Sequence, residues 1–255
     1  MPPLLERALL HALPIALRVG GVMSFAPFVG SSAVPARIKA VLTIVVTVLL
    51  YPVCNVPASV FTPGGWTRLV LVEAVLGLAL GLCLHFAVEA ALLAGQLAGF
   101  QFGFSLVNII DPQTNVDTPV LSLFYQLMTL MIFLQLNVHH WLFRGLAKSF
   151  EYVPVGSVVI SAAAMSELFR DASGMWLAGV QIATPLLLAT LLIDVMVGFL
   201  NKASPQMPAI LLSIPLKSVV GYAVLAVGLG LWPAFFERQF ALALGWSERV
   251  LHLAH

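Results

Sequence analysis

A long apolar run, LVLVEAVLGLALGLCLHFAVEAALLAGQLAGFQF, occupies residues 69–102. Only two of its 34 residues, Glu73 and Glu89, belong to the charged types Asp, Glu, Lys and Arg. Because the bilayer core is about 30 Å thick and about 20 apolar helical residues span it, this stretch exceeds one span. Strands are disfavoured, since an open strand in lipid leaves backbone groups without hydrogen bonds and the alternating pattern of a membrane barrel is missing. Residues 69–102 are therefore predicted to form a broken or bent pair of membrane helices.

The composition of the whole chain agrees with this class. Of the 255 residues, 60% are hydrophobic and 9% are charged, whereas a soluble domain carries about 25% charged residues. A water-soluble globular protein is thereby excluded. Further apolar regions cover residues 9–29, 38–53, 119–143, 175–200 and 208–236, and an amphipathic segment continues to residue 255. We predict an all-α integral membrane protein with about six or more long, partly broken or bent helices, forming one membrane-embedded domain over residues 1–255.

Several function classes find no support in the sequence. The formal net charge of +1 is too small and too thinly spread for a nucleic-acid-binding protein. Cys54 and Cys83 have no metal-ligand spacing, and adjacent helical residues such as His139 and His140 point about 100° apart. The chain has no nucleotide-binding loop, no G-x-S-x-G and no zincin motif. Neither an enzyme nor a bound cofactor or metal is expected.

Five ionisable side chains lie within apolar regions, where a charge costs about 2.5 to 3.5 kcal/mol at a helix centre. They are expected to face protein, either as buried pairs between helices or as parts of an ion or proton path. A continuous path along residues 73–89 is disfavoured, because successive steps of four residues drift about 40° around a helix. The five are Arg18, Glu73, Glu89, Asp194 and Lys217.

Glycines recur at four-residue spacing in the same part of the chain. Gly77 and Gly81 form one G-x-x-x-G pair, and Gly95, Gly99 and Gly103 form a doubled one. This spacing lets helix backbones approach closely in a membrane. We expect these five glycines to mediate close helix packing.

The segment FQFGFSLVNIIDPQTNVDTPV, residues 100–120, interrupts the helical pattern. Its first part is apolar, but the polar residues and prolines from residue 108 onward end a helix. An apolar loop at membrane depth must be buried in protein or line a cavity. Two interpretations remain: a constriction or plug, or an ordinary turn whose Phe and Ile side chains pack between helices.

Five stretches together resemble one known family. RVGGVMSFAPFVGSSAVPARIKA, residues 18–40, resembles the N-terminal signature of the FliR family of type III protein export apparatus subunits. Four more stretches are similar to that family in the same order. They are EAVLGLALG (73–81), GFQFGFSLVNIIDPQ (99–113), LNVHHWLFRGLAKSFEYVPVG (136–156) and DVMVGFLNKASPQMPAILLSIPLKSVVG (194–221).

The resemblance implies a non-enzymatic export-gate subunit in the bacterial inner membrane, within the flagellar basal body. It implies assembly with FliP and FliQ into a helical pore complex of bent hairpins, contact with FlhB, FlhA and membrane lipid, and passage of unfolded flagellar proteins. The family's plug loop corresponds to residues 104–120. There, an apolar constriction would resist ion leak by dewetting. The apolar members expected to seal it are Phe104, Leu106, Ile109 and Ile110, and those expected to shape the turn are Asp111, Pro112 and Gln113.

Two rival interpretations remain at this point. The injectisome subunit SctT is a paralogue of similar length, although residues 18–40 look more like the flagellar branch. A stand-alone secondary transporter could use the carboxylates and Lys217 as coupling residues. Such transporters usually contain an internal repeat with matching broken helices, and no convincing repeat is found here.

Overall fold

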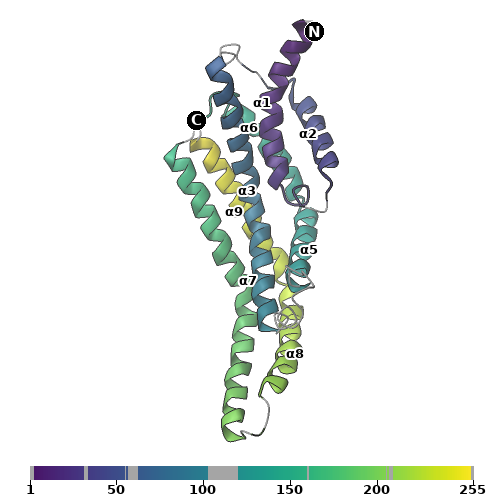
Figure 1. The fold of residues 1–255 in the computed structure, drawn as a ribbon, viewed down its shortest axis with the longest axis vertical. Coiled ribbons are helices and arrows are strands. Elements are labelled where there is room, and N and C mark those ends of the chain that lie inside the picture. Colours follow the sequence, from purple (N-terminus) through teal and green to yellow (C-terminus); the bar gives the residue numbers. More distant parts are fainter. Residues whose placement is uncertain are drawn as a thin grey trace. The chain divides into compact units, whose positions relative to one another are not determined.

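The computed structural model describes residues 3–31, 34–54, 56, 63–102, 120–159, 161–204, 206 and 209–253. These residues form eight helices and no strand, so the all-α class is confirmed for the described part of the chain (Figure 1). The helices are α1 (Pro3–Phe25), α2 (Ala36–Leu50), α3 (Pro63–Gln101), α5 (Val120–Gln135), α6 (Val138–Tyr152), α7 (Ala162–Ala203), α8 (Ala209–Leu229) and α9 (Trp232–Leu253).

Four helices are long and apolar enough to cross a membrane. Their apolar parts are residues 8–25, 65–101, 162–203 and 212–229. A fifth candidate span combines α5 with α6, which are bent by 68° at a short break. The break has a local cause, because Asn137 adopts a left-handed conformation with φ 56° just before α6. The described chain thus has the helices of an integral membrane protein.

Residues 69–102 do not form the broken pair predicted from their length. Residues 69–101 belong to α3, one continuous helix of 39 residues. Glycine disfavours a helix by about 1 kcal/mol but keeps its backbone N–H, whereas an interior proline removes a hydrogen bond and clashes with the preceding turn. Because Pro63 is the first residue of α3 and no other proline follows in it, the helix continues to Gln101.

The region predicted over residues 208–236 is divided instead. Its first part is α8, a turn follows at Gly230 and Leu231, and α9 begins at Trp232. The region at residues 175–200 is longer than expected, because it lies inside the 42-residue α7. The two longest helices among the described residues are therefore α3 and α7, whereas the apolar region at residues 208–236 is divided between α8 and α9.

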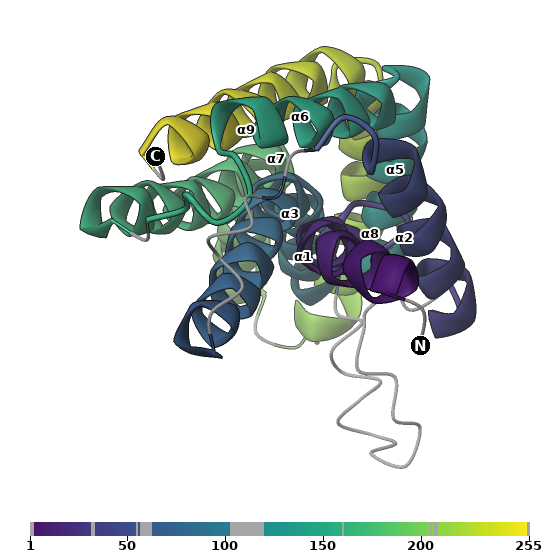
Figure 2. The same cartoon turned by 90° about the horizontal axis from the view of Figure 1, so that it is seen from above.

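The helices belong to two compact units, and α3, α5, α7 and α9 contribute residues to both. The first unit contains residues 1–86, 133–173 and 240–255. Within it, α1 lies along the N-terminal half of α3 (Figure 1), and α6 lies beside the C-terminal part of α9 (Figure 2). Helix α6 is amphipathic. Its buried residues are Val138, Leu142, Leu146, Ser149 and Phe150.

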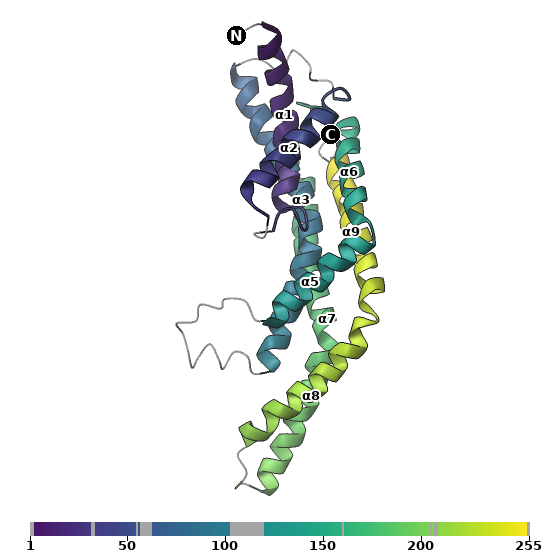
Figure 3. The same cartoon turned by 90° about the vertical axis from the view of Figure 1, so that its right-hand side faces the viewer.

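The second unit contains residues 87–132 and 174–239. Within it, α3 presents a stripe of small side chains at helical spacing: Ala87, Ala90, Ala94 and Ala98 are all 8% exposed or less. Helices α7 and α8 run side by side as a hairpin (Figure 3). Much of this hairpin is apolar and exposed in the single chain. Examples are Leu192 (65%), Phe199 (70%), Val219 (70%) and Val227 (75%).

Candidate functional site

Two fully buried, oppositely charged side chains meet in the first unit. Arg18 of α1 and Glu73 of α3 are both 0% exposed, and Arg18 Nε donates to Glu73 Oε2 at 2.6 Å. Arg18 Nη1 donates to two backbone carbonyls that end α6, those of Ser149 at 3.0 Å and Val153 at 2.9 Å. The pair thus joins α1 and α3 to the C-terminal end of α6, where the Ser149 carbonyl also accepts the backbone N–H of Val153.

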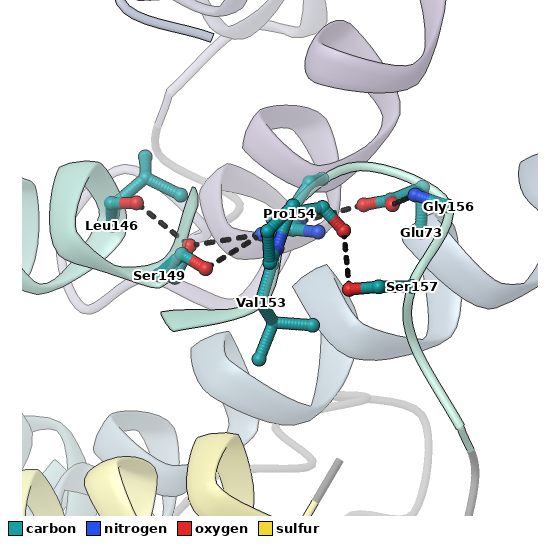
Figure 4. Close-up of polar contacts among 8 residues, drawn as sticks. Glu73, Leu146, Ser149, Val153, Pro154, Gly156 and Ser157 are labelled. Carbon is teal, nitrogen blue, oxygen red and sulfur yellow. Dashed lines mark hydrogen bonds and ion pairs between the residues drawn. The ribbon is translucent and has the colours of Figure 1, made fainter. Parts of the chain in front are cut away.

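Glu73 also holds the turn that follows α6. Its Oε1 accepts a hydrogen bond from the backbone N–H of Gly156 at 3.0 Å (Figure 4). Gly156 has a φ of 86°, which glycine adopts without the penalty that a Cβ would bring. Beside it, the Ser157 hydroxyl donates to the carbonyl of Pro154 at 2.8 Å. One glutamate therefore neutralises Arg18 and fixes the turn at residues 154–157.

The guanidinium of Arg18 is enclosed on a further side by an aromatic ring. Its Cζ lies 4.3 Å from the centroid of the Phe150 ring, a cation–π distance. Among the described residues, Arg18 Nη2 is buried without a hydrogen-bond partner. Removing one member of such a buried pair typically costs about 3–5 kcal/mol, because the other charge is left uncompensated. The network is thus a strong constraint on how α1, α3 and α6 dock.

Small residues bring α1 and α3 together around this pair. A Cβ on Gly77 would overlap the backbone of Arg18, and a Cβ on Gly81 would lie 2.8 Å from the carbonyl oxygen of Val22. Gly21 of α1 completes the contact, since a Cβ there would lie 2.7 Å from the backbone nitrogen of Leu78. The G-x-x-x-G spacing predicted the roles of Gly77 and Gly81 but not that of Gly21. The adjacent Gly20 was the only sign in the sequence that this part of α1 is small enough for a close helix contact.

The other glycines predicted to pack lie toward the end of α3. A Cβ on Gly95 would overlap Ser122 of α5, and Gly99 is buried. Gly103 lies outside the described residues. Sequence reasoning missed Gly179 of α7, where a Cβ would lie 2.9 Å from the carbonyl oxygen of Ala90. Close approaches in the second unit therefore involve α3, α5 and α7.

The remaining predicted charges lie in the second unit and do not join the Arg18 network. Lys217 of α8 pairs with Asp194 of α7 at 2.6 Å. The burial expected for Asp194 stays a prediction, because 46% of its side chain is exposed in the single chain, against 15% for Lys217. The reason is its position on the open face of the α7–α8 hairpin. Glu89 is half-buried in α3.

The predicted plug loop cannot be placed beside these features. Its expected seal and turn residues all lie outside the described part of the chain, whereas Val120, the first residue of α5, is 72% exposed. The plug role stays a prediction. The residues concerned are Phe104, Leu106, Ile109, Ile110, Asp111, Pro112 and Gln113.

Metal and thiol chemistry finds no site in the described residues. No three His, Cys, Asp or Glu side chains among them gather as metal ligands, and Cys54 and Cys83 are free thiols. The ring centroids of His139 and His140 are 4.2 Å apart. Sequence reasoning missed Asp171, which is 1% exposed and faces Cys83. In the sequence it is one carboxylate within a polar region, which gives no sign of burial.

Known proteins match this chain over almost its full length. The model of the family described as "Bacterial export proteins, family 1" matches residues 9–243. The flagellar biosynthetic protein FliR of Escherichia coli (strain K12) is 30% identical over 227 residues, which are 88% of this chain and 86% of that protein. FliR of Bacillus subtilis (strain 168) is 26% identical over 94% of each chain. FliR of Aquifex aeolicus is 27% identical over 92% of this chain and 91% of that protein.

Proposed function

This chain belongs to family 1 of the bacterial export proteins, and from that premise we propose that it is a core subunit of the flagellar type III export gate. In this role it assembles with FliP and FliQ in the inner membrane, within the flagellar basal body. Together they form the pore through which unfolded flagellar proteins leave the cell. The observation that carries the proposal is the match to flagellar relatives over nearly their whole length.

The surface of α2 supports assembly with partner subunits. Its 15 residues extend about 22 Å, which is less than the bilayer core of about 30 Å. Yet its large apolar side chains are exposed in the single chain. They include Val41 (60%), Ile44 (61%), Val48 (65%) and Leu49 (68%). A helix too short to span and too apolar for water is best accommodated against other protein.

The α7–α8 hairpin supports the same conclusion. Its exposed face is apolar but also contains the Asp194–Lys217 pair. Ionisable groups in a membrane are costly unless they face protein or a water-filled cavity. A neighbouring subunit would cover both the apolar side chains and the ion pair.

The transporter alternative has little geometric support. Glu73 is already paired with Arg18, Asp194 is paired with Lys217, and Glu89 belongs to a different unit from Glu73. Coupling residues of a transporter would be expected to converge on one site between repeats. The described geometry instead uses its charges in helix-to-helix pairs. We therefore assign no covalent chemistry and no cofactor to this subunit.

Co-expression with FliP and FliQ of the same host tests the assembly. A tagged copy is purified in mild detergent and its mass is measured by native mass spectrometry. A single defined hetero-oligomer is the expected result. A matched pair of variants sharpens the test: Ile44→Asn with Val48→Asn changes the exposed face of α2, whereas Glu151→Gln changes an exposed polar position on α6.

The double α2 variant is expected to lose partner subunits, and Glu151→Gln is expected to keep them. A stable monomer or homodimer of the unmodified chain, despite verified expression of both partners, would contradict the export-gate assignment.

A further inference from the structure

A cavity of about 400 Å³ lies within the first unit, between α6 and α9. This size falls within the range of about 300–1,000 Å³ that is usual for small-molecule sites. Helices α1 and α3 contribute the remaining apolar wall. The apolar lining includes Val22, Leu80, Leu84, Leu142, Leu146 and Leu251.

Two glycines on opposite sides keep this cavity open. Gly145 of α6 and Gly245 of α9 both line it, and a Cβ at either position would meet no atom within 4 Å. Their role differs from that of Gly77, where a Cβ would overlap a neighbouring helix. Glycine disfavours a helix relative to alanine, and here no close helix contact offsets that cost. The open space at these two positions indicates room for something other than protein backbone.

The rim of the cavity is basic and aromatic. Arg144 and Lys148 lie one turn apart on α6, are exposed and line the cavity. Trp141 and Tyr152 follow the same stripe of α6 and are 50% and 43% exposed. Glu248 of α9 also contributes, so the lining carries two cations against one carboxylate. Tryptophan and tyrosine are enriched at the membrane–water interface, and basic pockets between membrane helices bind anionic lipid headgroups.

We propose that this cavity binds an anionic phospholipid, with one acyl chain between α6 and α9 and the phosphate held by Arg144 and Lys148. The complementarity is twofold: apolar side chains surround the interior, and cations stand at the opening beside interfacial aromatic rings. The site lies within one unit of this chain and does not depend on the proposed export role.

Retained lipid gives the direct test. The full-length chain, in complex with its partners, is purified in mild detergent, and phosphatidylglycerol and phosphatidylethanolamine are quantified per chain by mass spectrometry. Gly145→Leu and Gly245→Leu fill the cavity and should each reduce retained phosphatidylglycerol by about tenfold or more. Gly198→Leu is the matched control, because a Cβ there also meets no atom within 4 Å and Gly198 does not line the cavity. It should leave the lipid content unchanged.

The headgroup contact has its own test. Arg144→Gln with Lys148→Gln removes the cations and keeps the apolar cavity. This variant should lower the ratio of phosphatidylglycerol to phosphatidylethanolamine severalfold. Arg238→Gln, an exposed position of α9 that does not line the cavity, should keep the ratio of the unmodified protein.

Two results would overturn the proposal. One is equal phosphatidylglycerol in the unmodified protein and in both leucine variants. The other is loss of a partner subunit from Gly245→Leu with lipid unchanged, which would make the cavity a docking site for protein. Because the glutamine variant acts at exposed side chains, its lipid ratio decides the question even if a leucine variant fails to fold. In that case, an unchanged ratio overturns the proposal.

Discussion

Two ion pairs of equal length have very different surroundings in this chain. Arg18–Glu73 and Lys217–Asp194 both have an N to O distance of 2.6 Å and both join two helices. The first pair is 0% exposed on both sides and is surrounded by carbonyls and an aromatic ring. The second leaves 46% of Asp194 exposed in the single chain. Distance alone therefore says little about what an ion pair contributes.

Burial decides the difference. A charge removed from water must recover its hydration energy from its partners, so deleting one partner of a buried pair is costly. The charges of an exposed pair stay hydrated, so their pairing stabilises the fold by only about 0–1 kcal/mol. The first pair fixes the docking of α1, α3 and α6. The second acquires a comparable role only when something covers the α7–α8 hairpin.

The largest expected effect is at the buried pair. Glu73→Gln leaves Arg18 as an uncompensated buried cation and should lower the free energy of unfolding by about 3–5 kcal/mol. Thermal unfolding of the purified protein in detergent measures the loss. The double variant Arg18→Met with Glu73→Leu should recover most of it, because an apolar pair of similar volume needs no charge compensation. A Glu73→Gln protein as stable as the unmodified one would show that the pair is not a constraint.

A smaller loss is expected where glycine lets α1 approach α3. Gly77→Ala places a Cβ against the backbone of Arg18 and should cost about 1–3 kcal/mol. Gly198→Ala is the control, since open space surrounds that position and alanine favours the helix by about 0.4–1 kcal/mol. Melting temperatures of the two variants should shift in opposite directions. Equal shifts would contradict the close approach.

The exposed pair should respond to its surroundings. Asp194→Asn should change the stability of the isolated chain by at most about 1 kcal/mol. If a neighbouring subunit covers the hairpin, the same substitution should cost more in the assembled complex, because the pair is then desolvated. Unfolding of the chain alone and within the complex compares the two cases. An equal, small effect in both would mean that the pair stays exposed after assembly.

The smallest effect concerns the thiol of Cys54, which follows α2. Burial raises the pKa of this thiol, and the charge of Arg18 opposes that effect while Glu73 adds to it. A raised pKa lowers the thiolate fraction at pH 7, so alkylation should be slower than for an ordinary cysteine, and its pH midpoint should lie above the ordinary thiol pKa of about 8.5. Iodoacetamide labelling of a Cys83→Ala variant over a pH series measures it. A midpoint at or below the ordinary value would contradict the burial effect.

The sequence predicted the class of fold well, and for a physical reason. Hydrophobic composition and the length of apolar runs are properties of single segments, and lipid accepts few structures besides helices. The same local reasoning failed for α3, because length alone suggested a break where no residue enforces one. The polar residues 147–173 indicate loops or short surface helices, whereas α6 continues to Tyr152 and the long helix α7 begins at Ala162.

The candidate site was predicted only in part. Because burying a charge is costly, the sequence indicated that four residues need partners, but it did not indicate which residues pair. The four are Arg18, Glu73, Asp194 and Lys217. Ser149, Val153 and Gly156 gave no signal, because they contribute through backbone groups and a turn. Backbone hydrogen bonds carry no side-chain signature in a sequence.

Composition and residue spacing were enough to predict an all-α membrane protein whose few charges need partners and whose glycines permit close packing. The folded chain was needed to see that Arg18 pairs with Glu73, 55 residues away, that Lys217 pairs with Asp194 on an exposed hairpin, and that α3 is unbroken. The reason is that pairing depends on which helix faces come together. That is set by packing over the whole chain, whereas composition and periodicity act within one helix.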